Sequence, residues 1–495
     1  MKKFLVGAVI LVMVVVMLFT LTACDKYKFN AVGTKEYANQ DAIGNGTLAV
    51  RQGNYLYFVN NVADDSDLTK EKNEWKANGT NGAIMKSTIN EDGTLTCLGI
   101  VVPKMYYTDA SNAGIYIYGE WIYYVARSQK TDNKGALLSS LEFMRTKIDG
   151  TKTQSIAIVE DLSAGYVFTK TGLIYSYDSN IHYVDYSGKK FKDTTVVEEY
   201  TDILFSEEDL CVFYTQANEN EYVLGNHLGV VTSTGENKTI IKEESYYAGS
   251  GDYRTDLSSL FTLDIIAYNA KDNSIYYTKT CKDTDAQATT NGYVIPDDYS
   301  FNRENEKTYV LTALSTIYSL GANVGIVDVS SATVSAYAPM TDAINVNKSD
   351  DVTFSSTITI LFEEGEYTYY LLGAKLHRTN LFVNNTVNKN AYEEKISDVA
   401  MSSKFGKPSY LNGYLYYESS DDATYLSRIK IADYDATTQA LIKGYIVSGY
   451  KDYQYPDDAD YVLNEEDDVI KGKVPAYITD EDLETYIENH KSTND

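Results

Sequence analysis

Short runs of aliphatic, β-branched and aromatic residues alternate with polar turns from about residue 45 to residue 449. In seven of these runs an aliphatic or aromatic residue is followed by Tyr or Phe, and several runs come directly after a turn such as Gly53-Asn54, Gly119-Glu120 or Asn412-Gly413. The seven runs are residues 55–58, 121–124, 173–175, 212–214, 274–277, 367–370 and 414–417. Because such residues fit the half-buried surface of a sheet, and no long amphipathic helix pattern interrupts them, the runs predict β-strands.

Each run is followed by a second one, in which aliphatic residues flank a residue that is often basic. The clearest is 141–150, LEFMRTKIDG, whose Asp-Gly supplies the positive φ angles of a tight turn. The others are 84–89, 181–188, 228–235, 324–329, 376–378 and 426–431. One strand pair cannot bury both faces of its sheet, whereas pairs stacked radially in a ring cover one another. The pattern therefore predicts an all-β protein, a β-propeller of about seven blades, with six to eight as the range, over residues 45–449. A β-sandwich and a β-solenoid are the alternatives.

The repeated pattern also resembles a known group of proteins. An aliphatic-Tyr-Tyr run followed by a Leu-x-Arg-x-x-Ile-Asp-Gly-type run is similar to bacterial extracytoplasmic β-propellers, which are related in form to the YWTD propeller repeats of lipoprotein receptors. The similarity is sharpest in the second and seventh strand pairs, and no Tyr-Trp-Thr-Asp run occurs. The resemblance implies a fold and a location outside the cytoplasm, and it implies no reaction.

The first 24 residues have the pattern of a targeting segment. Two lysines precede an apolar stretch over residues 4–21, and Leu21-Thr22-Ala23-Cys24 follows. This resembles the lipobox of bacterial lipoproteins, in which the cysteine thiol receives a diacylglycerol. We therefore expect residues 1–23 to be a signal peptide, Cys24 to be lipidated, and residues 24–44 to form a tether on the extracytoplasmic face of the cell membrane. An uncleaved transmembrane anchor is the alternative.

The charge balance limits the classes of partner. The chain has 495 residues with 43 Lys+Arg and 70 Asp+Glu, a formal net charge of −27. Such a chain lacks the basic surface that displaces counterions from nucleic acid or attracts anionic lipid, so we expect no nucleic-acid partner. Acidic residues dominate 450–495, which we interpret as a solvated tail in which Thr479 caps a short helix.

Candidate catalytic chemistry is sparse. No nucleophile elbow, P-loop, GxGxxG or HExxH motif occurs, and only four histidines are present. His182 lies in an expected strand among aromatic residues, which favours a structural role. Adjacent carboxylates on a strand point in opposite directions, so the acidic doublets are interpreted as solvated turns. The doublets are Asp64-Asp65, Glu198-Glu199, Glu207-Glu208, Asp297-Asp298, Glu363-Glu364 and Asp421-Asp422.

The remaining candidates are a metal site, a disulfide and a sugar site. Asp64, Asp65 and Asp67 do not have the spacing of a calcium-binding loop, so no metal or cofactor is expected. The three cysteines after Cys24 show no CxxC spacing, and the one at 211 lies in an apolar run typical of a buried residue. Trp121 and the tyrosines suit a packed core between blades, with a carbohydrate platform as the alternative.

These observations predict a lipid-anchored, extracytoplasmic β-propeller that acts as a non-enzymatic module binding a protein or glycan ligand. No catalytic residue is assigned, and the loop we expect to carry ligand contacts is the insertion at 283–307. The alternative is an enzyme acting on extracellular glycans with carboxylates gathered at the mouth of the propeller. A solute-binding lipoprotein of a transporter ranks last, because its lobes need helices that alternate with strands.

Overall fold

The computed structural model describes the chain from residue 35 to residue 471 with gaps, of which the longest are 61–81, 216–226, 282–307, 337–357 and 447–461. Within that described part the structure is built from β-strands, and its one helical element is the 3-10 turn η4 (Ile431–Asp433). No helix there is long and apolar enough to cross a membrane.

The strands form four-stranded antiparallel sheets of neighbouring segments, which we label A to G in chain order. Sheet A contains β1 (Ala49–Gln52), β2 (Tyr55–Asn60), β3 (Ala83–Ile89) and β4 (Leu95–Val102). Sheet B contains β5 (Tyr116–Tyr118), β6 (Trp121–Arg127), β7 (Leu141–Lys147) and β8 (Thr153–Val159). Sheet C contains β9 (Tyr166–Phe168), β10 (Gly172–Tyr177), β11 (Asn180–Asp185) and β12 (Lys192–Val197). Sheet D contains β13 (Asp202–Ser206), β14 (Leu210–Thr215), β15 (His227–Val231) and β16 (Asn237–Lys242).

The second half of the chain continues this arrangement. Sheet E contains β19 (Phe261–Asn269), β20 (Ser274–Cys281), β23 (Gly325–Asp328) and β24 (Val334–Ala336). Sheet F contains β25 (Ile358–Glu364), β26 (Tyr367–Leu372), β27 (Lys375–Thr379) and β30 (Glu393–Ser402), and sheet G contains β31 (Ser409–Leu411), β32 (Tyr414–Ser419), β33 (Leu426–Lys430) and β34 (Tyr445–Ile446). Two residue pairs between β30 and β32 join F and G into one eight-stranded sheet.

Short two-stranded pairs complete the described structure. They are β17 (Tyr247–Ala248) with β18 (Thr255–Asp256), β21 (Thr308–Leu311) with β22 (Ile317–Leu320), β28 (Phe382–Val383) with β29 (Thr386–Val387), and β35 (Val462–Glu465) with β36 (Asp468–Lys471). The last pair lies in the acidic C-terminal segment, for which the sequence predicted no strand; each of its strands contains two adjacent aliphatic residues. Thr479 and the helix expected after it lie outside the described residues.

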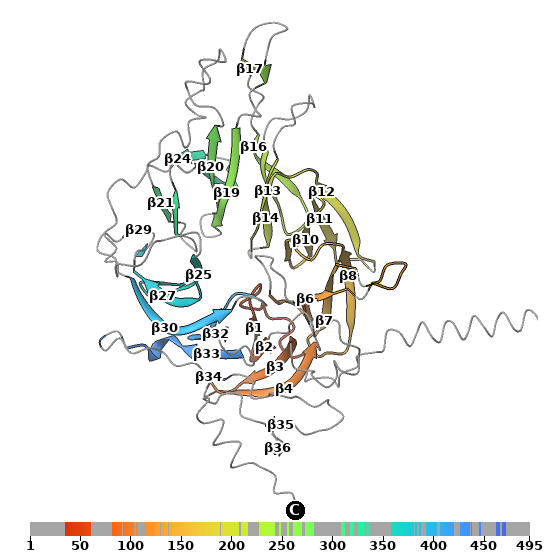
Figure 1. Ribbon diagram of the computed structural model, residues 1–495, viewed down its shortest axis with the longest axis vertical. Coiled ribbons are helices and arrows are strands. Elements are labelled where there is room, and N and C mark those ends of the chain that lie inside the picture. Colours follow the sequence, from red (N-terminus) through yellow and green to blue (C-terminus); the bar gives the residue numbers. More distant parts are fainter. Residues whose placement is uncertain are drawn as a thin grey trace, which may run out of the picture.

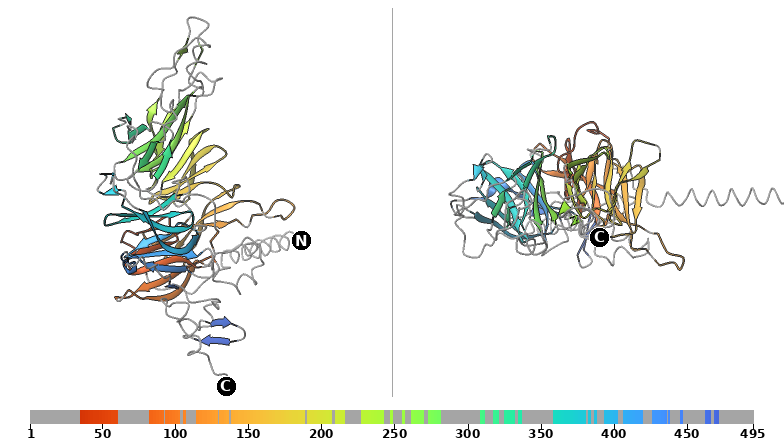
Figure 2. Two further views of the ribbon diagram at one scale, coloured as in Figure 1. Left: turned by 60° about the vertical axis from the view of Figure 1, so that its left-hand side comes forward. Right: turned by 90° about the horizontal axis from the view of Figure 1, so that it is seen from above.

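The protein is an all-β propeller, as the sequence predicted. Figure 1 shows the sheets arranged around a common centre, with the red-orange strands of sheet A beside the blue strands of sheet G, and Figure 2 shows these two sheets side by side from another direction. The first strands of neighbouring sheets contact one another, in the pairs β1 with β5, β9 with β13, β13 with β19, β25 with β31, and β31 with β1. These strands therefore surround the centre. Because F and G are joined, the number of seven blades stays a prediction.

The predicted strand pairs coincide with the second and third strands of the sheets. The pairs are β2–β3, β6–β7, β10–β11, β14–β15, β20–β23, β26–β27 and β32–β33, all antiparallel. Turn residues explain why these strands begin where they do. Asn412 and Gly413, between β31 and β32, both have positive φ angles, 53° and 81°, as a two-residue type I′ hairpin requires.

A tyrosine faces a basic residue at the same position of five sheets. In the register of the second and third strands the pairs are Tyr57–Lys86, Tyr123–Arg145, Tyr175–His182, Tyr369–Arg378 and Tyr416–Arg428. The basic group lies on aromatic rings and also reaches the next sheet in several cases. Lys86 Nζ, for example, donates to the Ile148 carbonyl of sheet B at 3.4 Å, and the Arg145 guanidinium lies 4.7 Å from the ring of Phe191, which follows sheet C's β11. The repeat is thus a cationic link between sheets.

The hydrophobic core lies between adjacent sheets, as expected for a propeller. One cluster of buried side chains joins sheets B, C and D, and it contains edge-to-face contacts of Phe143 with Tyr166 and Phe168 at centroid distances of 5.2 and 5.9 Å. Other clusters join A with B, D with E, and F with G. Burial of each large side chain contributes about 1.5–3 kcal/mol. Cys211 is buried in this core as a free thiol, and burial raises its pKa to about 12.

In the described part of the chain, sheets A and G meet without sharing a strand. Among the described strands, sheets A and G each consist of strands consecutive in the chain. Closure depends instead on side-by-side contact, in which Thr47 pairs with Lys407 and the Ser409 hydroxyl donates to the Ala49 carbonyl at 2.6 Å. Arg428 Nη2 donates to the Gly93 carbonyl at 3.0 Å, which adds a cationic link across the same junction.

Candidate functional site at the mouth of the central channel

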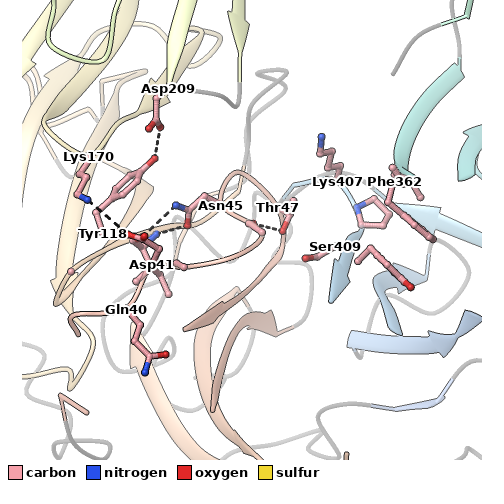
Figure 3. Close-up of a pocket in the computed structure, with 17 residues that line it drawn as sticks. Gln40, Asp41, Asn45, Thr47, Tyr118, Lys170, Asp209, Phe362, Lys407 and Ser409 are labelled. Atoms are coloured by element: carbon pink, nitrogen blue, oxygen red, sulfur yellow. Dashed lines mark hydrogen bonds and ion pairs between the residues drawn. The ribbon is translucent and has the colours of Figure 1, made fainter. Parts of the chain in front are cut away.

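A cavity of about 580 Å³ opens where the central channel meets one end of the ring (Figure 3). Its lining comes from six segments: residues 40–47 before β1, the end of β5, the turn after β9, the turn before β14, the middle of β25, and residues 407–410 at the start of β31. These segments belong to sheets A, B, C, D, F and G. The position is typical of a ligand site, because loops and turns of several rigid sheets converge there.

The turns between first and second strands lie on this face of the ring, and the N-terminal segment runs across them. Lys35 Nζ lies 2.9 Å from Glu120 Oε2 at the β5–β6 turn. Gln52 Nε2 donates to the carbonyls of Gln40 and Gly119, at 3.0 and 2.9 Å. The segment is therefore fixed to sheets A and B before it forms one wall of the cavity.

Three polar side chains in the lining are already used to hold the backbone. Asn45 Oδ1 accepts from the Ile117 amide at 2.8 Å, and Asn45 Nδ2 donates to the carbonyl of the same residue at 3.3 Å. The Thr47 hydroxyl lies 2.8 Å from the Ala49 carbonyl, to which Ser409 also donates. These groups shape the cavity and leave little hydrogen-bonding capacity for a ligand.

One wall carries a tyrosine and a half-buried aspartate. The Tyr118 hydroxyl lies 2.6 Å from Asp209 Oδ1 and 2.9 Å from the Phe168 carbonyl. The phenol has one proton, and its shorter bond is the one that it donates to the Asp209 carboxylate. Burial raises the pKa of Asp209 above its ordinary value, although the Tyr118 hydrogen bond and the nearby Lys170 charge lower it. This contact joins sheets B, C and D.

An exposed ion pair lies next to that wall. Lys170 Nζ, in the β9–β10 turn, lies 3.8 Å from Asp41 Oδ1 of the N-terminal segment, and the two side chains are 73% and 98% exposed. Figure 3 shows both side chains near Tyr118 and Asn45. Because solvent screens such a pair, it contributes little to stability and is available to a ligand.

The opposite wall is aromatic. The rings of Tyr410 and Phe362 are parallel within 5° at a centroid distance of 3.8 Å, and Tyr369 stacks on Phe362 at 4.5 Å. Phe362 and Tyr410 both line the cavity. Burial, together with the Glu364 carboxylate, raises the pKa of Tyr410, so its hydroxyl stays neutral. The cavity thus has a polar wall from sheets B to D and an aromatic wall from sheets F and G.

Residues that the sequence singled out lie elsewhere when they are described. His182 stacks on Tyr175 at 4.8 Å, and its Nδ1 lies 3.4 Å from Asp193 Oδ1, so it has the structural role that was expected. Trp121 lies beneath the Arg145 guanidinium at 4.2 Å and carries no open ring face at the cavity. The structure therefore places Trp121 in the link between sheets.

The acidic and cysteine candidates that the structure describes do not come together in a site. Glu198-Glu199 and Glu363-Glu364 are exposed, and no group of three or more His, Cys, Asp or Glu in the described part of the chain is arranged to hold a metal ion. Several candidates lie outside the described residues. They are Cys24, Asp64, Asp65, Asp67, Glu207-Glu208, Asp297-Asp298, Asp421-Asp422 and the 283–307 insertion.

Sequence reasoning missed the residues that line the cavity, namely Asp41, Tyr118, Lys170, Asp209 and Tyr410. Four of them lie within four residues of the turn between the first and second strand of a sheet, or in that turn. The turn dipeptides before each Tyr-bearing run were visible in the sequence. The polar and aromatic residues at and next to those turns include most of this set.

Comparison with known proteins adds no activity. No protein-family model matches the chain, and no curated protein matches it significantly. Similar solved structures include the β-propeller domain of the Trilobed protease from Pyrococcus furiosus (8% identity, TM-score 0.34, covering 79% of this chain and 94% of that one) and Saccharomyces cerevisiae Sqt1 (9%, 0.31, 74% and 95%). A prolyl endopeptidase structure is 11% identical with a TM-score of 0.34; the match covers 83% of this chain, which spans half of that peptidase. The β-propeller assignment depends on the sheets of this chain, which define a propeller with a two-walled cavity at its channel mouth.

Proposed function

We propose that the protein is a lipid-anchored, extracytoplasmic β-propeller that binds a ligand in the channel-mouth cavity without transforming it. The observation that carries this proposal is the cavity itself, which six sheets assemble from a polar wall and an aromatic wall. Rigid sheets hold these walls in place, so the site is formed before the ligand arrives and little ordering is needed on binding.

The course of the N-terminal segment supports the anchored arrangement. Lys35 is 11 residue steps after Cys24, a length of chain that spans at most about 40 Å when extended. Lys35 lies at the same face of the ring as the cavity, through its ion pair with Glu120. A lipid on Cys24 would therefore hold the cavity close to the membrane surface.

The state of the carboxyl groups favours binding over catalysis. Asp209 is hydrogen-bonded to Tyr118, and Asp41 is paired with Lys170, so each carboxyl already has a partner. No histidine lines the cavity. The cavity thus offers hydrogen bonds and an aromatic surface, which suit recognition.

Two experiments test this proposal. Replacement Cys24→Ala should move the protein from the detergent phase to the aqueous phase in a cloud-point extraction, and unchanged partition would contradict the anchor. Compounds that raise the unfolding temperature of the protein should lose this effect in Asp41→Ala and Tyr410→Leu, and keep it in Tyr177→Ala, which changes an exposed tyrosine away from the cavity. Stabilisation retained in both cavity variants would place the site elsewhere.

One observation favours the second candidate, an enzyme acting on extracellular glycans. Asp209 has a raised pKa and a second carboxylate, Asp41, lines the same cavity, which is the pairing of acid and carboxylate that glycoside hydrolysis uses. Turnover of a glycan by the purified protein, abolished by Asp209→Asn, would establish this function. Absence of turnover together with retained binding would leave the binding function.

A further inference from the structure

The two walls of the cavity limit the shape of the ligand. Tyr410 is the last ring of the stack Tyr410–Phe362–Tyr369: it lies on Phe362 at 3.8 Å, and Phe362 lies on Tyr369 at 4.5 Å. Asp41 and Lys170 are on the polar side. A ligand that uses both walls needs a flat apolar face on one side and hydrogen-bonding groups on the other.

The charges of the lining limit its electrostatic class. The lining contains two lysines, at 170 and 407, and two aspartates, at 41 and 209, so positive and negative groups are matched. A cation that approaches Asp41 is repelled by the Lys170 ammonium 3.8 Å away, and Asp209 lies beside the Tyr118 hydroxyl. An anion is opposed by the net charge of −27 on the whole chain. An uncharged ligand is therefore favoured.

The hydrogen-bonding groups that remain are suited to hydroxyls. Asn45, Thr47 and Ser409 are bonded to the backbone, whereas Asp41 and Lys170 form an exposed pair that a ligand can reach. A carboxylate accepts from two hydroxyls and an ammonium donates to their oxygens, so vicinal hydroxyls can take the place of water around this pair. Because the ion pair is exposed, opening it costs little.

We propose that the cavity binds a neutral oligosaccharide, with one sugar ring packed against Tyr410 and the hydroxyls of that or the next ring bonded to Asp41 and Lys170. The apolar face of a pyranose is flat and matches an aromatic side chain, and its hydroxyls project from the ring edge. A volume of about 580 Å³ accommodates two to three sugar units. This inference deepens the proposed function and rests on it.

The test is isothermal titration calorimetry of the full chain with trisaccharides of different charge. The neutral probes are cellotriose, maltotriose and tri-N-acetylchitotriose; trigalacturonate and deacetylated chitotriose are the anionic and cationic counterparts. We expect at least one neutral probe to bind, with affinity reduced about tenfold in Tyr410→Ala and in Asp41→Ala. Tyr177→Ala, an exposed tyrosine outside the cavity, should bind as the wild type does.

The outcomes separate this inference from the function it rests on. If no neutral probe binds, the saccharide inference is overturned. A Phe-Phe dipeptide is titrated as an additional probe. If only this dipeptide or a charged trisaccharide binds, and its affinity falls in Asp41→Ala, the saccharide inference is overturned while a ligand cavity stands. If a neutral probe binds equally well to both cavity variants, the site is elsewhere and both proposals are overturned. Asp41→Ala changes an exposed side chain, so it keeps the test informative should Tyr410→Ala unfold.

Discussion

Lys86 of β3 provides the sharpest physical test of the link between sheets. Its side chain is 0% exposed, and its Nζ lies 4.0 Å from the ring centroid of Tyr55 and 5.3 Å from that of Tyr57. Burial lowers its pKa from the ordinary value of 10.5 to about 8, against the opposing attraction of Asp149. At neutral pH the lysine is therefore charged in the folded state, at a cost in free energy.

The size of this cost follows from the pKa difference. Between pH 8 and 10.5 the unfolded chain binds more protons at Lys86 than the folded protein does, so the free energy of unfolding rises with pH in this window. The cost is about 3 kcal/mol at pH 7 and falls to about 1.5 kcal/mol at pH 9.5. Because this cost falls, the free energy of unfolding of the wild type should rise by about 2 kcal/mol between pH 7 and pH 9.5.

Urea unfolding at pH 7 and pH 9.5 measures this effect in the wild type and in Lys86→Met. Every other titrating group is common to both proteins, so the difference between their pH dependences isolates Lys86. The wild type should gain about 2 kcal/mol relative to the variant, and the exposed Lys130→Met should follow the wild type. Parallel pH profiles of the wild type and Lys86→Met would refute the reasoning, because Lys86 would then titrate alike in both states.

Three further predictions concern closure, a turn and the cavity. Arg428→Met removes the bond to the Gly93 carbonyl across the ring junction and should lower the free energy of urea unfolding by about 1–3 kcal/mol, whereas a loss under about 0.5 kcal/mol would contradict a closing role. Gly53→Ala should cost about 1–3 kcal/mol, because φ is +60° and the new Cβ would lie 2.2 Å from the Tyr37 ring; Tyr37→Ala should recover part of it in the double variant, and no recovery would disprove the clash. Asp209 has a raised pKa when folded, so wild-type stability should fall as pH rises from the ordinary aspartate range through that pKa; Asp209→Asn should lack this fall, and equal profiles would contradict the raised pKa.

The strand pairs could be predicted because their sequences carry two signals at once. Residues 414–417 and 426–431 combine buried aromatic and aliphatic residues with a turn whose geometry needs Asn412 and Gly413. Several of the first and fourth strands carry neither signal. β9 and β31 are only three residues long, and β12 has four exposed residues out of six, so no alternation distinguishes it from a loop.

The position of the cavity could not be predicted from the length of insertions, which favoured residues 283–307. β20 ends at Cys281, which pairs with Phe261 at the start of β19, whereas Asn269 pairs with Ser274 beside the turn between these two strands. The end of β20 that precedes the insertion is thus opposite the end that corresponds to the cavity face. Short turns of sheets B, C and D, residues of β25 and β31, and the segment before β1 acquire a common site only when the sheets place them together. Such convergence depends on ring geometry, which no single stretch of sequence contains.

Closure of the ring and formation of the cavity use the same residues, which couples stability to binding. Thr47 pairs with Ile115 of sheet B and with Lys407 before sheet G, so one residue joins three parts of the ring. Lys407 and Ser409 also line the cavity. A ligand that contacts both the N-terminal segment and residues 407–410 bridges the junction between sheets A and G, which share no strand in the described part of the chain. Its binding energy therefore adds directly to the stability of the closed ring, by RT ln(1 + [L]/Kd), and a ligand at a hundred times its Kd would raise the free energy of unfolding by about 2.7 kcal/mol.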